Sequence, residues 1–255
     1  MQLNVGFWVV TLAAALGLAA SVVWTIARGA SASALSAPSQ RLLIRGIALL
    51  MALWATIVVL AAEAGAFQFS PGFPIPFIGI GVAAPIVIGA LIFALSPALR
   101  AAVAAAPQEN IIAIQAFRAL GIVFIILLAE KRLPAEFALP AGIGDVLVGL
   151  AALPVAYLFA SRAPSAPAAG VIFNLAGILD LVTAVGVGFF ASTTPVRLIL
   201  TNPSTDLLSL LPLVSIPAFG VPLFAMLHFA SLQKIFVDAR FRAMGRSAEP
   251  GAQAA

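Results

Sequence analysis

The chain has 255 residues, of which 63% are hydrophobic and only 9% are charged, with a formal net charge of +4. Soluble domains are about 45–50% apolar and about 25% charged, so this composition is typical of an integral membrane protein. Cysteine is absent and His228 is the single histidine, which excludes thiolate chemistry and a multi-histidine metal site within the chain. The sequence therefore predicts no cofactor and no metal.

Seven segments are apolar over the roughly 20 residues that a helix needs to cross a bilayer. They predict an all-α integral membrane protein, a polytopic bundle of seven transmembrane helices in one domain over residues 1–237, with the lipid bilayer as its partner. The first segment is longer than the apolar region of a signal peptide, so we expect a retained helix. The predicted spans are 4–27, 42–63, 76–96, 110–130, 134–160, 170–191 and 203–232.

Lysine and arginine residues concentrate on one side of this predicted bundle. The 13 divide as nine on one side, three on the other and Arg118 inside a span (9 + 3 + 1 = 13). The positive-inside rule then places the N-terminus outside and the C-terminus in the cytoplasm, and indicates orientation signals in a bacterial inner membrane, not nucleic-acid binding. Residues 238–255 are predicted to form a basic, disordered cytoplasmic tail. The nine are Arg28, Arg41, Arg45, Arg100, Arg162, Lys234, Arg240, Arg242 and Arg246.

The fourth, fifth and sixth spans each carry an ionisable side chain, namely Arg118, Asp145 and Asp180. Such a group costs about 3 kcal/mol or more at the bilayer centre unless it is paired, so its presence needs a reason. At about 1.5 Å per residue, all three lie at similar depth, and we expect them to meet. One guanidinium and two carboxylates leave a net charge of −1, which requires a proton or a bound cation. We expect Arg118 to pair with Asp180 and Asp145 to carry the proton.

Small and polar residues share a helix face with each of these charges, at spacings of three or four. The glycines are predicted to let neighbouring helices approach closely, as small residues do in membranes. The polar residues, together with Ser215 in the last span, are predicted to line a pathway. The glycines are Gly142, Gly149 and Gly177, and the polar residues are Gln115 and Asn174.

The last predicted span contains Pro212, Pro217 and Pro222 at five-residue spacing. Internal prolines free backbone carbonyls, so this pattern predicts either a broken helix of the kind that transporters use near the midplane or a helix that is merely kinked. His228 lies further along the same span. We expect it to be a hydrogen-bonded anchor near the cytoplasmic interface.

The motif Gly-Ile-Gly-Asp at residues 142–145 resembles the active-site motif of the GxGD intramembrane aspartyl proteases, the presenilin and signal-peptide-peptidase group. The resemblance implies that Asp145 is one of two catalytic carboxyls that share a proton. Asp180 departs from the pattern of the second, because it follows Leu179 instead of tyrosine and comes after the Gly-x-Gly-Asp motif instead of before it.

Three functions remain open at this point. The leading hypothesis is a proton- or cation-coupled transporter or channel for a small solute, built on Asp145, Asp180 and Arg118. The alternatives are a non-catalytic membrane packing or assembly subunit and a GxGD-type protease. No Gly-x-Ser-x-Gly, His-Glu-x-x-His or phosphate-loop motif occurs, so the sequence favours a non-enzymatic role.

Overall fold

The computed structural model describes residues 4–70 and 77–247, and this part of the chain is helical without any β-strand. Seven of its helical stretches are long and apolar enough to cross a membrane, which confirms a multi-pass helical membrane protein. The elements are α1 Val5–Ala32, α2 Ala37–Glu63, α3 Phe77–Leu95, α4 Pro97–Ala105, α5 Gln108–Ala113, η1 Ile114–Gly121, α6 Ile122–Ala129, α7 Ala135–Ala160, α8 Ala166–Phe190, η2 Asp206–Ser209, η3 Ile216–Gly220 and α9 Val221–Ser247.

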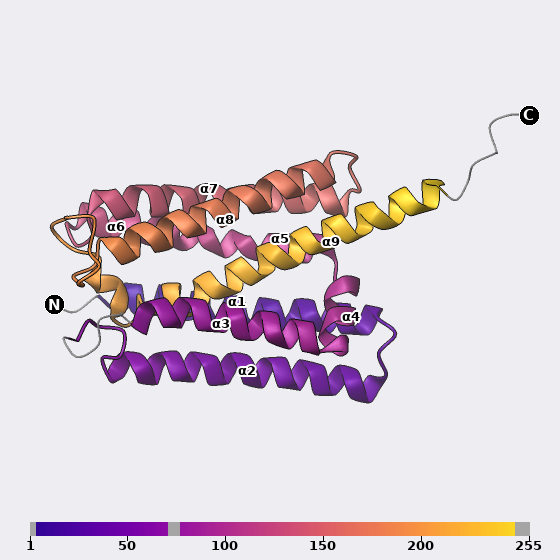
Figure 1. Ribbon diagram of the computed structural model, residues 1–255, viewed down its shortest axis with the longest axis horizontal. Helices are drawn as coiled ribbons and strands as arrows, with labels where there is room; N and C mark the ends of the chain where they lie inside the picture. The colour runs from indigo at the N-terminus through magenta and orange to yellow at the C-terminus, as the bar shows by residue number, and fades with distance from the viewer. Residues whose placement is uncertain (1–3, 71–76, 248–255) are drawn as a thin grey trace, which may run out of the picture.

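The helices form two groups with α9 running obliquely between them (Figure 1). The segment α5–η1–α6 packs with α7 and α8 on one side, while α1, α2 and α3 lie on the other. The short helix α4 packs against α1, where Gly29 comes so close to the backbone of Ala102 that a larger residue would collide with it. We call α5–η1–α6, α7, α8 and α9 the site half of the molecule.

Several helices begin at the prolines that interrupt the sequence pattern. Pro38, Pro97 and Pro167 lie in the first turns of α2, α4 and α8, where a proline removes no hydrogen bond. Ser96 caps α4 by accepting a hydrogen bond from the backbone N–H of Leu99 at 3.1 Å. The first and last residues of the first six spans consequently lie within about five residues of the predicted ones, an offset that capping and fraying commonly produce.

The fourth and seventh spans both contain irregular helix. The fourth span changes from α-helix to 3₁₀-helix over η1 and back again. The seventh span begins with η3, a single turn of π-helix, and not at residue 203 as expected. Short 3₁₀ and π segments inside helices often mark functional positions. Neither segment was expected from the sequence.

The three prolines act at the start of the seventh span and do not interrupt its middle. Pro212 precedes the helix, Pro217 lies in η3, and Pro222 is the second residue of α9. The prolines therefore shape the entry to the seventh span, in place of the two expected alternatives, a helix broken near the midplane and a helix that is merely kinked. At its other end α9 continues to Ser247, so residues 238–247 of the predicted tail are helical, and residues 248–255 lie outside the described residues.

Helices α2 and α3 have few buried residues. A groove of about 840 Å³ with an almost entirely apolar lining runs between α2, α3 and α9. No residue of α3 is buried, and α2 is held near η3 by one polar contact, in which Trp54 Nε1 donates to the carbonyl oxygen of Ala218 at 3.0 Å. Their exposed apolar side chains, such as Leu53 and Ile88, are expected to contact lipid.

Candidate functional site: a buried guanidinium between two carboxylates

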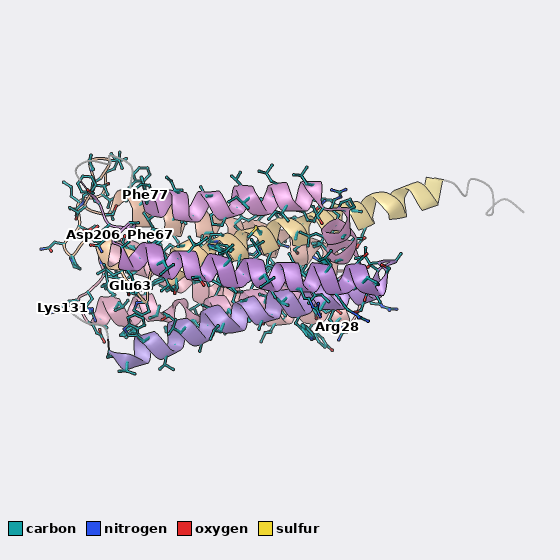
Figure 2. All side chains as sticks on the ribbon, turned by 90° about the horizontal axis from the view of Figure 1, so that it is seen from below. Arg28, Glu63, Phe67, Phe77, Lys131 and Asp206 are labelled. Carbon is teal, nitrogen blue, oxygen red and sulfur yellow. The ribbon has the colours of Figure 1, made fainter. Side chains whose placement is uncertain are left out.

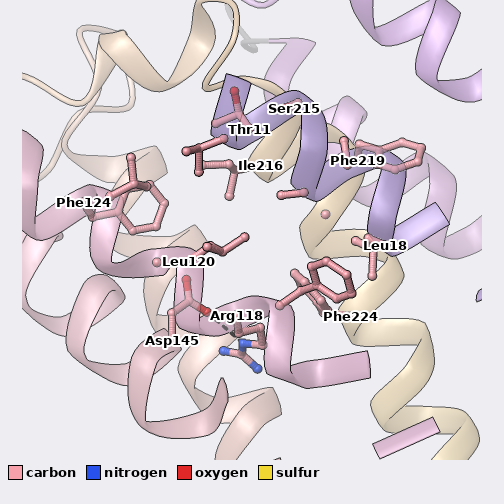
Figure 3. Close-up of a pocket in the computed structure, with 17 residues that line it drawn as sticks. Thr11, Leu18, Arg118, Leu120, Phe124, Asp145, Ser215, Ile216, Phe219 and Phe224 are labelled. Atoms are coloured by element: carbon pink, nitrogen blue, oxygen red, sulfur yellow. Dashed lines mark hydrogen bonds and ion pairs between the residues drawn. The ribbon is translucent and has the colours of Figure 1, made fainter. Parts of the chain in front are cut away.

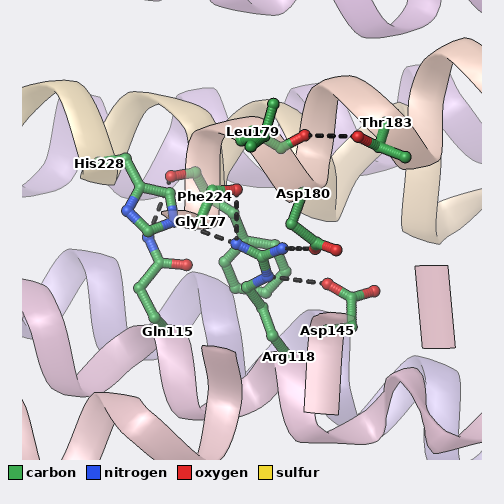
Figure 4. A network of polar contacts seen from close by, with 9 residues as sticks. All are labelled: Gln115, Arg118, Asp145, Gly177, Leu179, Asp180, Thr183, Phe224 and His228. Atoms are coloured by element: carbon green, nitrogen blue, oxygen red, sulfur yellow. Dashed lines mark hydrogen bonds and ion pairs between the residues drawn. The ribbon is translucent and has the colours of Figure 1, made fainter. Parts of the chain in front are cut away.

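Arg118 lies in the 3₁₀ segment η1 and connects α7 to α8 (Figure 4). Its Nε donates to Asp145 Oδ1 at 2.8 Å, and its Nη2 forms an ion pair with Asp180 Oδ2. The side chain of Arg118 is fully buried, and those of the two aspartates are 14% exposed. The three charges that the sequence predicts at similar depth are therefore in direct contact, at the centre of the site half.

The pairing differs from the expected one, in which Arg118 binds Asp180 alone. The guanidinium is a planar fork with five N–H donors, so it can bind two carboxylates on different helices at once. The formal charge of the cluster remains −1 when all three groups are ionised, because the one cation is shared by two anions. Neither aspartate is without an arginine contact.

Three glycines provide the space that these side chains occupy. A Cβ atom on Gly121 would collide with Asp145, one on Gly144 would collide with Asp180, and one on Gly177 would collide with the ring of His228. Gly144 directly precedes Asp145 in α7, and Gly177 lies three residues before Asp180 in α8. Each glycine stands opposite a polar group of a neighbouring helix, so the charges can sit close to the backbone.

The predicted packing glycines of α7 lie against the fourth span. A Cβ on Gly149 would collide with the backbone N of Ala119, and one on Gly142 would lie 2.7 Å from Ile125 Cδ1. Gly142 and Gly149 therefore allow α7 to approach η1 and α6 closely, as small residues do in membrane helix pairs. This close approach brings Asp145 to Arg118.

His228 belongs to the polar cluster and is not an interfacial anchor. It is fully buried, and its Nε2 lies 3.1 Å from Arg118 Nη1. An arginine N–H can only donate, so Nε2 accepts, which leaves Nδ1 protonated to donate to Asn174 Oδ1 at 2.8 Å. The expectation of an interfacial anchor was wrong, because the sequence around a single histidine does not show which neighbouring helix its side chain contacts.

The hydrogen bonds continue from His228 toward the end of the bundle that carries α4. Asn174 Nδ2 donates to Ser231 Oγ at 2.8 Å, and Gln108 Nε2 donates to the same Ser231 oxygen at 2.7 Å. We call His228, Asn174, Ser231 and Gln108 the polar relay. It joins α5, α8 and α9 on one side of Arg118, and Gln108 and Ser231 were not expected in the site.

The predicted pathway residues have different positions. Gln115 and Asn174 are each 1% exposed and are held in the interior, where Gln115 Nε2 donates to the carbonyl oxygen of Phe224 at 3.0 Å. Ser215 is half-buried and lines a cavity together with Asp145. Ser215 thus lines one of the two cavities at Asp145, and Gln115 and Asn174 line neither of them.

Two cavities meet at Asp145. The first, which we call the aromatic cavity, has a volume of about 70 Å³ and lies between α1, η1, α6 and η3 (Figure 3). The second, which we call the outer cavity, has a volume of about 80 Å³ and extends from Asp145 to Ser192 and Thr205 in the loop after α8. A water molecule needs about 10–15 Å³ of such space, so each cavity holds a few waters or a very small ligand.

Within the described ranges 4–70 and 77–247, no group of three or more histidine, aspartate and glutamate side chains is arranged to hold a metal ion. The ionisable chemistry of the site is therefore that of one guanidinium, two carboxylates and one imidazole. Such a cluster can exchange a proton or pair with a cation, because its carboxylates exceed its fixed positive charge.

Comparison with known proteins places the chain in a family. No curated protein and no solved structure matches it. Residues 75–236 match the family model described as Domain of unknown function (DUF8737). The matched range contains the whole charge cluster and the polar relay, and begins after α2. The match covers more than half of the chain, and the protein belongs to the DUF8737 family.

Proposed function

We propose that the protein is a proton- or cation-coupled transporter or channel for a small solute. One observation carries the proposal: a buried guanidinium binds two carboxylates inside the membrane spans, and one of these carboxylates borders two cavities. Charged groups within membrane spans are costly and typically mark ion or substrate pathways. The excess of one carboxylate gives the cluster a reason to take up a cation or a proton.

In this function Asp145 takes up and releases the proton or cation, because it is the aspartate that lines both cavities. Arg118 binds Asp145 and Asp180 together and redistributes its hydrogen bonds when Asp145 becomes neutral. The 3₁₀ segment η1 carries Arg118 and the π segment η3 faces it across the aromatic cavity. Irregular turns of this kind change geometry at lower cost than a regular helix, so both can move during transport.

Neither cavity at Asp145 is lined by a residue of the polar relay. The outer cavity leads toward the end of the bundle that carries Glu63 and Asp206 (Figure 2). The polar relay closes the opposite side of Arg118, which carries most of the basic residues. With the positive-inside rule, we infer that the N-terminus and this opening face outward in a bacterial inner membrane. Alternating access then requires the relay to open.

A packing or assembly subunit is the competing function, and one observation favours it. Four of the five N–H groups of Arg118 already have partners inside the chain: Asp145, Asp180, Gly177 and His228. A cluster whose hydrogen bonds are largely satisfied within the protein is compatible with a purely structural role, in which it specifies which helices pack together. The arrangement does not favour a GxGD protease, because a guanidinium lies between the two carboxyls that would have to share a proton.

Ion-jump currents of reconstituted protein on a solid-supported membrane test the proposal. Steps in pH or in cation concentration should give transient currents with wild type, and Asp145→Asn should abolish them, because the variant has no carboxylate at the cavity. Glu63→Gln is the matched control, since it removes one carboxylate from the exposed end of α2. Currents of equal size in Asp145→Asn and wild type would refute the proposed role of Asp145.

A further inference from the structure

The aromatic cavity has a polar lining that accepts hydrogen bonds. Thr11 Oγ1 donates its proton to the carbonyl oxygen of Phe7, and Ser215 Oγ donates its proton at 2.7 Å to that of Pro212. A hydroxyl whose proton is used within the protein presents only lone pairs to a ligand. At this cavity Thr11 and Ser215 therefore act as acceptors, as the carboxylate of Asp145 does.

One oxygen of Asp145 is directed away from Arg118 and into the cavity (Figure 3). Arg118 binds Oδ1, and no other described residue donates a hydrogen bond to Oδ2. Arg118 lines the same cavity, but four of its five N–H groups are bound within the protein. The cavity therefore attracts a positive ligand and offers little to an anion.

The remaining walls are aromatic and aliphatic. Phe124, Phe219 and Phe224 surround the space above Asp145 (Figure 3), and Phe117 is a further aromatic residue of the lining. The first three rings are buried, and Arg118 Cζ lies 6.0 Å from the centroid of Phe224, so one of them already faces a cation. Aromatic rings around a carboxylate are the combination that recognises ammonium ions carrying carbon substituents.

A bare metal ion fits this lining less well than an organic cation does. Hard cations are held by six or more oxygens in the well-known sites for calcium and magnesium, whereas here one carboxylate and two hydroxyls face a largely carbon-lined space. The volume of about 70 Å³ limits the ligand to a few non-hydrogen atoms. Two lining residues of the cavity, Val10 on α1 and Leu120 on η1, are also exposed on the outside of the bundle, where we expect lipid.

We propose that the aromatic cavity binds a small organic ammonium ion, with its positive charge against Asp145 and its carbon substituents against the phenylalanine rings. This inference rests on the proposed function and names the class of its solute. The outer cavity shares Asp145, Phe124 and Ile216 with the aromatic cavity, and so supplies the route by which the ion arrives from the end that carries Asp206.

Calorimetry and saturation-transfer NMR on the full chain in nanodiscs test the inference with tetramethylammonium chloride. The expected result is saturable binding to wild type, with no binding of tert-butanol, a neutral molecule of the same number of heavy atoms. Asp145→Asn should weaken binding by about 30-fold or more, because it removes the negative charge that lines the cavity. Phe219→Leu should weaken it about tenfold while the charge cluster stays intact. Glu63→Gln should bind as wild type does.

The outcomes separate this inference from the function on which it rests. Absence of saturable tetramethylammonium binding to wild type, or equal binding of tert-butanol, overturns the assignment of the solute class. Equal affinity in wild type and Phe219→Leu overturns the role of the aromatic walls. If tetramethylammonium fails to bind but ion-jump currents still depend on Asp145, only the solute class is wrong. If tetramethylammonium fails to bind and the currents are also independent of Asp145, both the solute class and the proposed transport function are wrong.

Discussion

The site half and the α2–α3 side of the molecule differ in how much of their membrane-spanning helices is buried within the protein. Half of the residues in the apolar window of the span Gln108–Ala129 are buried within the protein, against none in that of Phe77–Leu95. Lipid is as apolar as leucine, so burial of apolar surface does not drive helices together in a membrane. Polar contacts and small residues do, and they concentrate in the site half.

The two sides also differ in their relation to the family. All residues of the charge cluster and the polar relay lie within residues 75–236, whereas α1 and α2 lie outside the matched range. Helix α3 is within it but has no buried residue. The matched range thus contains the whole charge cluster and the whole polar relay, and we expect substitutions there to have the largest effects.

Arg118→Leu should have the largest effect on stability. It leaves two carboxylates without their cation, and breaking a buried ion pair from one side costs about 3–5 kcal/mol. The yield of monodisperse protein in size-exclusion chromatography and its melting temperature should both fall sharply. The triple change Arg118→Leu, Asp145→Asn and Asp180→Asn should recover much of the loss, because no charge remains unpaired. A triple variant that is as unstable as the single one would contradict this electrostatic explanation.

Two glycines of α8 give the next contrast. Gly177→Ala should destabilise the protein by about 1–3 kcal/mol, because the added methyl group collides with the His228 ring and lies 3.1 Å from Arg118 Nη1. Gly186→Ala should be neutral or stabilising by up to about 1 kcal/mol, since nothing lies within 4 Å of its added carbon. Melting temperatures of the two variants measure the difference. Equal destabilisation would show that α8 tolerates no methyl group at either place.

A pair on α9 tests the polar relay. His228→Leu removes the acceptor for Arg118 and the donor to Asn174, and leaving buried polar groups unpaired costs about 1–3 kcal/mol. Gln233→Leu, one turn further along the helix and on the apolar groove, should change stability little. Thermal unfolding followed by circular dichroism is the measurement. A larger loss in Gln233→Leu would mean that the groove, not the relay, holds α9.

The smallest effect is expected on the lipid-facing side. Leu53 on α2 is 58% exposed, so Leu53→Ala should change the unfolding free energy by no more than about 0.5 kcal/mol. Leu127 on α6 has no exposed surface, and Leu127→Ala should cost about 2–5 kcal/mol. A substantial loss in Leu53→Ala would indicate that this surface is covered by something other than lipid.

The sequence was sufficient to predict the helical membrane class and the meeting of the three charges, because composition indicates the first and the rise per residue gives the three charges similar positions along their spans. The prediction that Arg118 binds a single aspartate was wrong. The position of a residue along its span does not determine how its side chain is oriented toward the neighbouring helices. His228 and Ser231 were missed as partners for the same reason. The 3₁₀ segment η1 has no signal of its own in the sequence, and the π turn η3 has none apart from Pro217 within it.

Thiol labelling tests most directly whether Asp145 is reached from one end of the bundle. The chain contains no cysteine, so single substitutions can be read without a background. A membrane-impermeant methanethiosulfonate reagent added outside intact cells should label Ser192→Cys in the outer cavity and Ser215→Cys beside Asp145, and spare Ser231→Cys in the relay. Labelling of Ser231→Cys with protection of Ser215→Cys, or protection of both cavity positions, would contradict the account.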